Sequence, residues 1–287
     1  MTTAPVAVDS RPARKRRSAS SSRRSGTALT PASGLGLGVS MIWFSLLVLI
    51  PLSAIVVKAS GGGWSTYEAV LTSENTRAAL QLTVVSALLI TLVNMVMGTI
   101  IAWVLVRDRF HGKAILDLVI DIPFAMPTIV AGLVLLSLYG PQSPIGVQVN
   151  GTRWSVLLAM AFVTLPFVVR TVQPVLEELD TDVEDAAASL GSSRFTTFRR
   201  VVLPALVPAI FAGAALAFAR GISEYGALVL ISGNLPRKTE VVSVRLFSFL
   251  EGGNTEAAAA VATIMLFVAL LAIVALDMIQ RRVARRG

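Results

Sequence analysis

Residues 79–106 read ALQLTVVSALLITLVNMVMGTIIAWVLV, a run of 28 residues without a charged side chain. Arg77 and Arg107 stand just outside its two ends. An apolar run of about 18 or more residues with few charges is typical of a transmembrane helix. At about 1.5 Å per residue this run is long enough to cross a hydrocarbon core of about 30 Å. We therefore expect the bilayer, rather than water, to be the main solvent of this chain.

Five further apolar runs indicate that the chain crosses the membrane six times. The six expected spans cover about 37–57, 79–106, 114–138, 154–173, 204–231 and 257–280. We predict an all-α integral membrane protein whose transmembrane domain extends over 37–282. The preceding residues, 1–36, are rich in Ser and Arg and lack apolar periodicity, which indicates a disordered basic tail.

The composition excludes several kinds of functional site. Of the 287 residues, 54% are hydrophobic and 15% are charged, and the mean hydropathy is +0.74. The chain has no Cys and one His, so disulfides, thiolate metal sites and cysteine nucleophiles are excluded, and histidine metal clusters are not expected. We expect no metal site, no bound cofactor and no catalytic residue in this chain.

The positive charges indicate an orientation. If the N-terminus is cytoplasmic, 18 of the 25 Lys and Arg fall in cytoplasmic segments and 6 in external segments, and Arg220 lies within the fifth span. Cytoplasmic loops of membrane proteins carry an excess of Lys and Arg, so both termini are predicted to be cytoplasmic. This distribution accounts for the net charge of +8 without a nucleic-acid partner.

The segment between the fourth and fifth spans, residues 174–203, is dense in helix signals. Thr181 and Glu184 have the spacing of a capping box, and Gly191 is expected to end the helix. Ser192 or Ser193 is then predicted to cap a second short helix that runs through Arg200, before Pro204 opens the fifth span. A helix–glycine–helix elbow of this kind suits docking into a groove on a partner. The alternative is a plain connector on the membrane surface.

The elbow resembles a loop of the permease subunits of bacterial ABC importers. Asp185-Ala186-Ala187, Gly191 and the later Leu203-Pro204 have the spacing of the family's EAA loop, with Asp185 where Glu is commoner. The resemblance implies a type I importer fold and a coupling helix that docks on a cytoplasmic ATPase dimer. The residues implied in coupling are Glu184, Asp185, Ala186, Ala187, Gly191, Leu203 and Pro204.

Three further stretches, 117–128, 167–179 and 221–240, are similar to one branch of that family, the T-type sulfate/thiosulfate permeases. This resemblance implies import of sulfate, and of thiosulfate, across the cytoplasmic membrane of a prokaryote. It also implies three partners, namely the ATPase dimer, a W-type permease and an external sulfate-binding protein. The chain has no G-x-x-x-x-G-K-[ST] motif, so ATP and Mg²⁺ are expected to bind to the partner ATPase.

Charged and helix-breaking residues within the spans have two interpretations each. Arg220 and Glu224 are four apart, so they form either part of the anion path or an internal ion pair that holds the fifth span to its neighbours. Pro123 and Pro127 are predicted to kink the third span, for packing or for gating. Two acids of the same span, at positions 117 and 121, are expected to pair with Arg107, Arg109 or Lys113.

Two rival functions stay open at this point. A molybdate or tungstate permease would share the architecture, because these oxyanions have a similar size and charge. A secondary anion transporter or channel would belong to another class. It would need no ATPase-docking elbow and would often show paired half-repeats.

Overall fold

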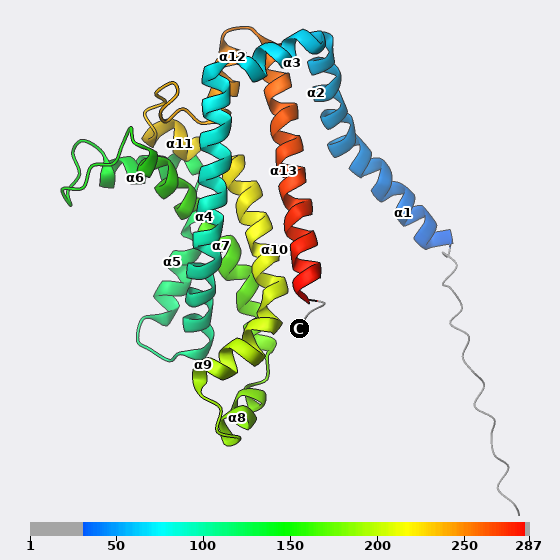
Figure 1. Cartoon of the computed structure of the whole chain (residues 1–287). Helices are drawn as coiled ribbons and strands as arrows, with labels where there is room; N and C mark the ends of the chain where they lie inside the picture. Colours follow the sequence, from blue (N-terminus) through cyan, green and yellow to red (C-terminus); the bar gives the residue numbers. More distant parts are fainter. Residues whose placement is uncertain (1–30, 285–287) are drawn as a thin grey trace, which may run out of the picture. The chain divides into compact units, whose positions relative to one another are not determined.

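A computed structural model describes residues 31–284, and every regular element within that range is helical (Figure 1). Five helices are long and apolar enough to span a membrane, and a bent pair brings the number to six if it counts as one span. The expectation of an all-α membrane protein is confirmed. The chain divides into two compact units, Met1–Pro51 and Leu52–Gly287, which are described separately.

The first unit contains α1 (Pro31–Phe44) and η1 (Ser45–Leu49), and α2 (Ile50–Gly61) begins in it. These elements belong to a continuous helix of mean hydropathy 2.4 that is long enough to span a membrane. The expected tail falls mostly on residues 1–30, outside the described residues. The prediction is wrong for residues 31–36, which are helical, and Pro31 suits the first turn of a helix.

The second unit is built around three long helices that pack on one another, α4, α7 and α10. Figure 1 shows α8 and α9 at one end of these helices and α3 and α12 at the other. Besides most of α2, the elements of the second unit are α3 (Gly63–Thr72), α4 (Glu74–Arg107), α5 (Lys113–Ala125), α6 (Thr128–Tyr139), α7 (Arg153–Glu178), α8 (Thr181–Ser189), α9 (Arg194–Thr197), η2 (Phe198–Val202), α10 (Leu203–Ile222), α11 (Gly226–Ile231), α12 (Val242–Glu251) and α13 (Thr255–Ala284).

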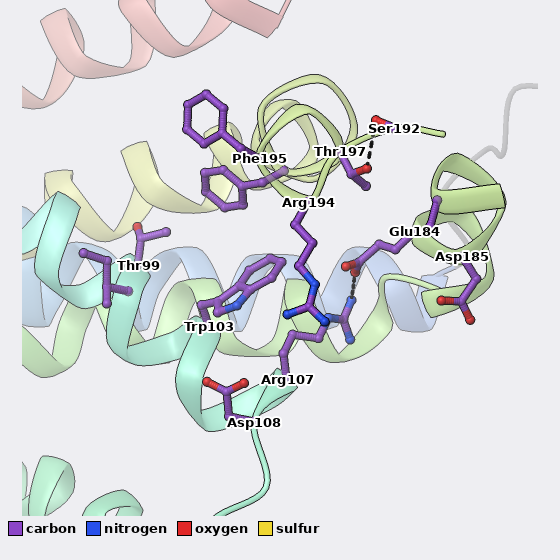
Figure 2. Close-up of a pocket in the computed structure, with 13 residues that line it drawn as sticks. Thr99, Trp103, Arg107, Asp108, Glu184, Asp185, Ser192, Arg194, Phe195 and Thr197 are labelled. Atoms are coloured by element: carbon purple, nitrogen blue, oxygen red, sulfur yellow. Dashed lines mark hydrogen bonds and ion pairs between the residues drawn. The ribbon is translucent and has the colours of Figure 1, made fainter. Parts of the chain in front are cut away.

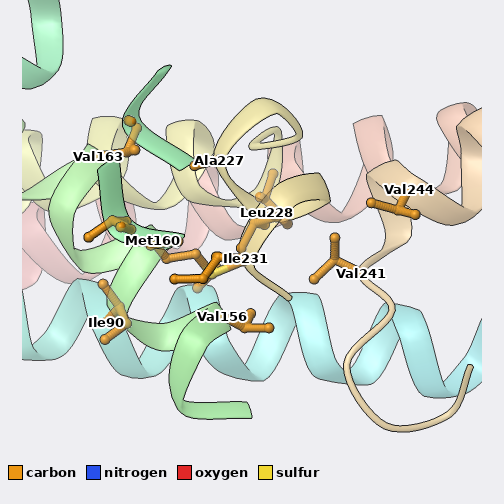
Figure 3. Close-up of a cluster of buried hydrophobic side chains, with 14 of the residues drawn as sticks. Ile90, Val156, Met160, Val163, Ala227, Leu228, Ile231, Val241 and Val244 are labelled. Carbon is orange, nitrogen blue, oxygen red and sulfur yellow. The ribbon is translucent and has the colours of Figure 1, made fainter. Parts of the chain in front are cut away.

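Two buried clusters hold the long helices together. One is centred on Met160 of α7 with Leu228 and Ile231 of α11 (Figure 3). The other lies nearer α8 and includes Leu176 of α7 and Leu206 of α10. These side chains are fully buried by packing within the chain. The clusters place the start of α10 and the end of α7 side by side, which positions the segment between them.

The third predicted span is not a single kinked helix. α5 and α6 meet at 117°, with the break at Met126–Pro127. Met126 adopts an extended conformation (φ −106°, ψ 146°), as expected for a residue before proline. Pro123, by contrast, lies inside α5. Pro127 therefore breaks the helix, and the prediction that both prolines kink a continuous span is wrong.

The fifth predicted span, 204–231, is also displaced. α9, η2 and α10 form one apolar helix from Arg194 to Ile222, and α11 follows as a separate short helix. The expected boundary at Pro204 is absent because a π-turn precedes it, in which Leu203 donates its N–H to the carbonyl of Phe198. The second short helix of the elbow is thus continuous with the span.

α6 and α11 approach so closely that their contact requires glycine. A methyl group on Gly132 would lie 2.7 Å from the carbonyl oxygen of Ala227 and 2.8 Å from its Cα. Both are backbone atoms, so the helices must separate to admit it. We expect Gly132→Ala to destabilise the protein by about 1–3 kcal/mol, visible as a lower thermal midpoint in detergent. Gly221→Ala is the matched control, because its methyl meets side chains at an ordinary 3.5 Å.

Candidate functional site

The elbow predicted from the sequence contains α8, but its first turn is capped by a different residue. Asp180 is the N-cap, and its Oδ1 accepts a hydrogen bond of 3.0 Å from the backbone N–H of Asp182. The predicted capping box of Thr181 and Glu184 is therefore wrong. Thr181 is the first helical residue, and the carboxylate of Glu184 reaches another helix.

Gly191 ends α8 as the sequence predicts. Its φ is +80°, in the left-handed region that favours glycine. The N–H of Gly191 donates to the carbonyl of Ala188 (2.9 Å), and the N–H of Ser192 donates to that of Ala187 (3.0 Å). This is a Schellman motif, which turns the chain sharply after the helix. Ser193 then caps α9 by accepting from the N–H of Thr196 (3.3 Å).

A groove of about 770 Å³ separates this elbow from the end of α4 (Figure 2). α4 contributes Trp103 and Arg107, and the elbow contributes Glu184 and Phe198. Trp103 meets Phe198 edge to face, with ring centroids 5.3 Å apart. This aromatic contact fixes η2 against α4.

Arg107 joins three elements at the groove. Its Nη2 donates to the backbone carbonyl of Leu179, at the end of α7, over 3.0 Å. The same nitrogen lies 2.8 Å from Oε1 of Glu184 in α8. The two side chains are only 15% and 22% exposed, so water screens the pair weakly. The end of α4 is thereby tied to α7 and α8 by one guanidinium group.

Sequence reasoning missed this function of Arg107, which was expected either as a topogenic charge or as the partner of two acids in the third span. No local signal reveals the contact, because Arg107 and Glu184 are far apart in the chain. The one hint is that Glu184 has a neighbour, Asp185, of the same charge. The two acids point in different directions, since Glu184 is half-buried against Arg107 and Asp185 is exposed.

The remaining residues implied in coupling lie on or beside the outer surface of the elbow. Ala186 and Pro204 are exposed, whereas Ala187 and Leu203 are half-buried. Two large apolar side chains project beside them, with Leu190 89% exposed and Phe195 72% exposed. An exposed surface that combines an acid with large apolar groups is typical of a docking site for another protein.

A second polar cluster lies between α5 and α7 and corrects another expectation. The predicted partners of Asp117 and Asp121 were Arg107, Arg109 or Lys113. Arg170 of α7 is the partner instead, with Asp117 at 2.7 Å and Asp121 at 2.7 Å. Its Nε also donates to Asp121, so the contact with this carboxylate is bidentate. The cluster holds α5 against α7.

The predicted pair of Arg220 and Glu224 is present, at 2.6 Å, but not within one helix. α10 ends at Ile222, and Glu224 lies in the connection to α11. The side chain of Glu224 is 1% exposed, and its Oε1 accepts a hydrogen bond from the N–H of Ala227 in α11 (2.8 Å). This geometry supplies the internal ion pair, and a role in the anion path stays a hypothesis.

Within residues 31–284, the structure brings together no group of three or more His, Asp or Glu side chains that would hold a metal ion.

Comparison with known proteins gives consistent matches. The family model described as "Binding-protein-dependent transport system inner membrane component" matches residues 94–286. The sulfate transport system permease protein CysT of Salmonella typhimurium is 42% identical over 93% of this chain and 97% of its own length. Its Escherichia coli counterpart has the same identity and coverage. A chain of a bacterial alginate ABC transporter, solved with an alginate pentasaccharide-bound periplasmic protein, has the same fold, with a TM-score of 0.74 at 16% identity over 88% of this chain and 94% of its own.

Proposed function

The chain belongs to the family of binding-protein-dependent transport system inner membrane components, and we propose that it is the permease subunit of an ABC importer that carries sulfate across the inner membrane. The observation that carries this proposal is the 42% identity to sulfate permeases along nearly the whole chain. The apolar helices and the type I importer fold agree with it. The chain acts as a permease and not as an enzyme.

The proposal assigns the elbow to coupling with a partner ATPase dimer. The exposed Asp185, Leu190 and Phe195 form the surface that docks on the ATPase. ATP and Mg²⁺ bind to that partner. When the ATPases close, α8 moves, and the contact between Glu184 and Arg107 carries the movement to α4 and the end of α7. The excess of Lys and Arg supports a cytoplasmic position for the elbow and for both termini.

Three finer features are part of the same proposal. A W-type permease supplies the other half of the transmembrane pathway, an external binding protein delivers the anion, and thiosulfate is carried as well as sulfate. In this proposal the external protein does most of the selecting among anions. The names of the relatives favour sulfate over molybdate or tungstate, and the family favours an importer over a secondary transporter or channel.

The proposal is tested by isolating the chain with its natural partners and reconstituting the complex in liposomes. We expect an ATPase and a second permease to copurify. We also expect uptake of labelled sulfate that requires ATP and the external binding protein, with competition by thiosulfate. Molybdate uptake at the same rate, or sulfate uptake by the chain alone without ATP, would refute the assignment.

A further inference from the structure

A pocket of about 370 Å³ lies beside the first half of α4 and is rich in positive charge. Arg153, at the start of α7, and Arg237 and Lys238, in the connection between α11 and α12, line it together with Gln81 and Ser86 of α4. The three cations are exposed to solvent. Since a water molecule occupies about 30 Å³ in the liquid, the pocket has room for a tetrahedral dianion with part of its hydration shell.

The connection that carries two of these cations is held in one conformation. The backbone N–H groups of Lys238, Thr239 and Glu240 all donate to the carbonyl of Leu235, at 3.1, 2.9 and 3.0 Å. Arg237 has a φ of +63°, which is uncommon for a residue with a side chain. The N–H of Leu235 in turn donates to the hydroxyl of Thr239 (3.1 Å). The charged side chains therefore project from a fixed backbone.

Two acids close in sequence or space to the pocket's cations, Glu74 and Glu240, neutralise little of its positive charge. Glu74 pairs with Arg237 at 3.3 Å, but the side chains are 80% and 63% exposed, so the pair is weak. Glu240 is buried and lies 4.0 Å from Arg245 of α12. Burial raises the pKa of Glu240, and the charge of Arg245 opposes this shift. A net excess of positive charge in a hollow attracts anions.

The pocket and the elbow lie at opposite ends of α4. Its α4 residues lie between Ala78 and Leu89, whereas Arg107 at the other end faces the groove of the elbow. At about 1.5 Å per residue, these positions are separated by roughly 27–44 Å along the helix axis, comparable to the thickness of a bilayer. If the elbow faces the cytoplasm, as the proposed function requires, the pocket faces the outside.

We propose that this cationic pocket is a receiving site for sulfate, which it binds from the external solution before the anion passes between the permeases. The inference rests on the proposed function. Recognition is by charge, through exposed Arg and Lys side chains, and so the affinity is low and sensitive to salt. A weak site suits this position, because a tightly held anion would not move on. In water, a cation about 4 Å from the anion raises the binding constant by about five-fold for each unit of negative charge on the anion.

The test measures binding of labelled sulfate to the purified importer in neutral-lipid nanodiscs, without the external binding protein. Arg153→Gln with Lys238→Gln is the test variant, and Arg281→Gln with Arg282→Gln removes two cations at the opposite end of the bundle. We expect the test variant to bind sulfate at least ten-fold more weakly in nanodiscs. In liposomes supplied with ATP and the external binding protein, we expect it to lose uptake at low sulfate, while its maximal rate of uptake stays normal. The control variant should match the wild type in binding.

The outcomes separate this inference from the proposed function. If the wild type imports sulfate and the test variant binds the anion as tightly as the control variant, the inference of a receiving site is wrong and the proposed function stands. If anionic phospholipid, added to the nanodiscs in a parallel measurement, abolishes the binding of sulfate, the pocket holds a lipid headgroup and the inference fails. It also fails if the test variant loses only its affinity for the external binding protein. If the wild type imports no sulfate, the proposed function itself is refuted.

Discussion

Gly191→Pro will reduce sulfate uptake by about 100-fold in the reconstituted importer, while the protein still reaches the membrane. Proline fixes φ near −65°, whereas Gly191 has φ +80° and donates its N–H to the carbonyl of Ala188. Proline has neither the positive φ nor the N–H, so the cap after α8 cannot form. We expect the loss to destabilise the elbow by about 3 kcal/mol or more. Since about 1.4 kcal/mol corresponds to a factor of ten, the elbow adopts its docking conformation in about one molecule in a hundred.

Two variants control for this result. Gly191→Asn should retain most of the uptake, because Asn tolerates the left-handed region. Gly146→Pro matches the backbone defect elsewhere, since Gly146 has φ +73°, donates its N–H to the carbonyl of Ser143 and has open space around it. We expect Gly146→Pro to leave transport nearly normal. Full uptake by Gly191→Pro at normal membrane abundance would remove the elbow from the coupling mechanism.

The end of α8 illustrates what sequence can predict. The conformation of Gly191 follows from a local rule, because a glycine after a helical run adopts the left-handed conformation at little cost. The long apolar runs are equally local, since the bilayer requires them at any place in the fold. The N-cap was misplaced by one residue, because Asp180 and Thr181 are both suitable caps and neighbouring helices decide between them.

The positions at which the spans break cannot be predicted from the local sequence alone. Pro123 and Pro127 have similar sequence contexts, yet only Pro127 ends a helix. A proline removes one backbone hydrogen bond, and whether the helix continues depends on the neighbours that replace it. Here α6 packs on α11 through Gly132 and Gly226, and this packing stabilises the turn at Pro127. That contact joins distant parts of the chain.

Ion pairs between helices were the least predictable feature of the candidate site. Charge and spacing favoured nearby partners for Asp117 and Asp121, but Arg170 on another helix reaches both. The pair of Arg220 with Glu224 was predicted because its four-residue spacing is visible in the sequence, although α10 ends before Glu224. Arg107 has no such spacing to Glu184, so its position at the groove emerges only from the packing of α4, α7 and α8.

The second large effect that we expect is a loss of coupling when the guanidinium group of Arg107 is removed. Arg107→Gln leaves the half-buried carboxylate of Glu184 without its cation and weakens the contact with the carbonyl of Leu179. Losing a charge-assisted contact of this kind costs about 1.5–3 kcal/mol. Because the cost falls on the contact between α8 and α4, ATP hydrolysis should continue while sulfate uptake per ATP falls about ten-fold. Parallel assays of hydrolysis and uptake measure this ratio.

A double-mutant cycle decides whether the two side chains act as one contact. If Arg107 and Glu184 transmit movement together, Arg107→Gln with Glu184→Gln will be no worse than Arg107→Gln alone, because the second change removes a partner already lost. Independent effects would multiply, which would contradict a shared role. Arg281→Gln is the matched control, since Arg281 pairs with Asp277 at the same 2.8 Å but is 70% exposed. Such a pair contributes about 0–1 kcal/mol, so a loss of coupling in Arg281→Gln as large as in Arg107→Gln would mean that charge alone, and not the contact at the groove, controls transport.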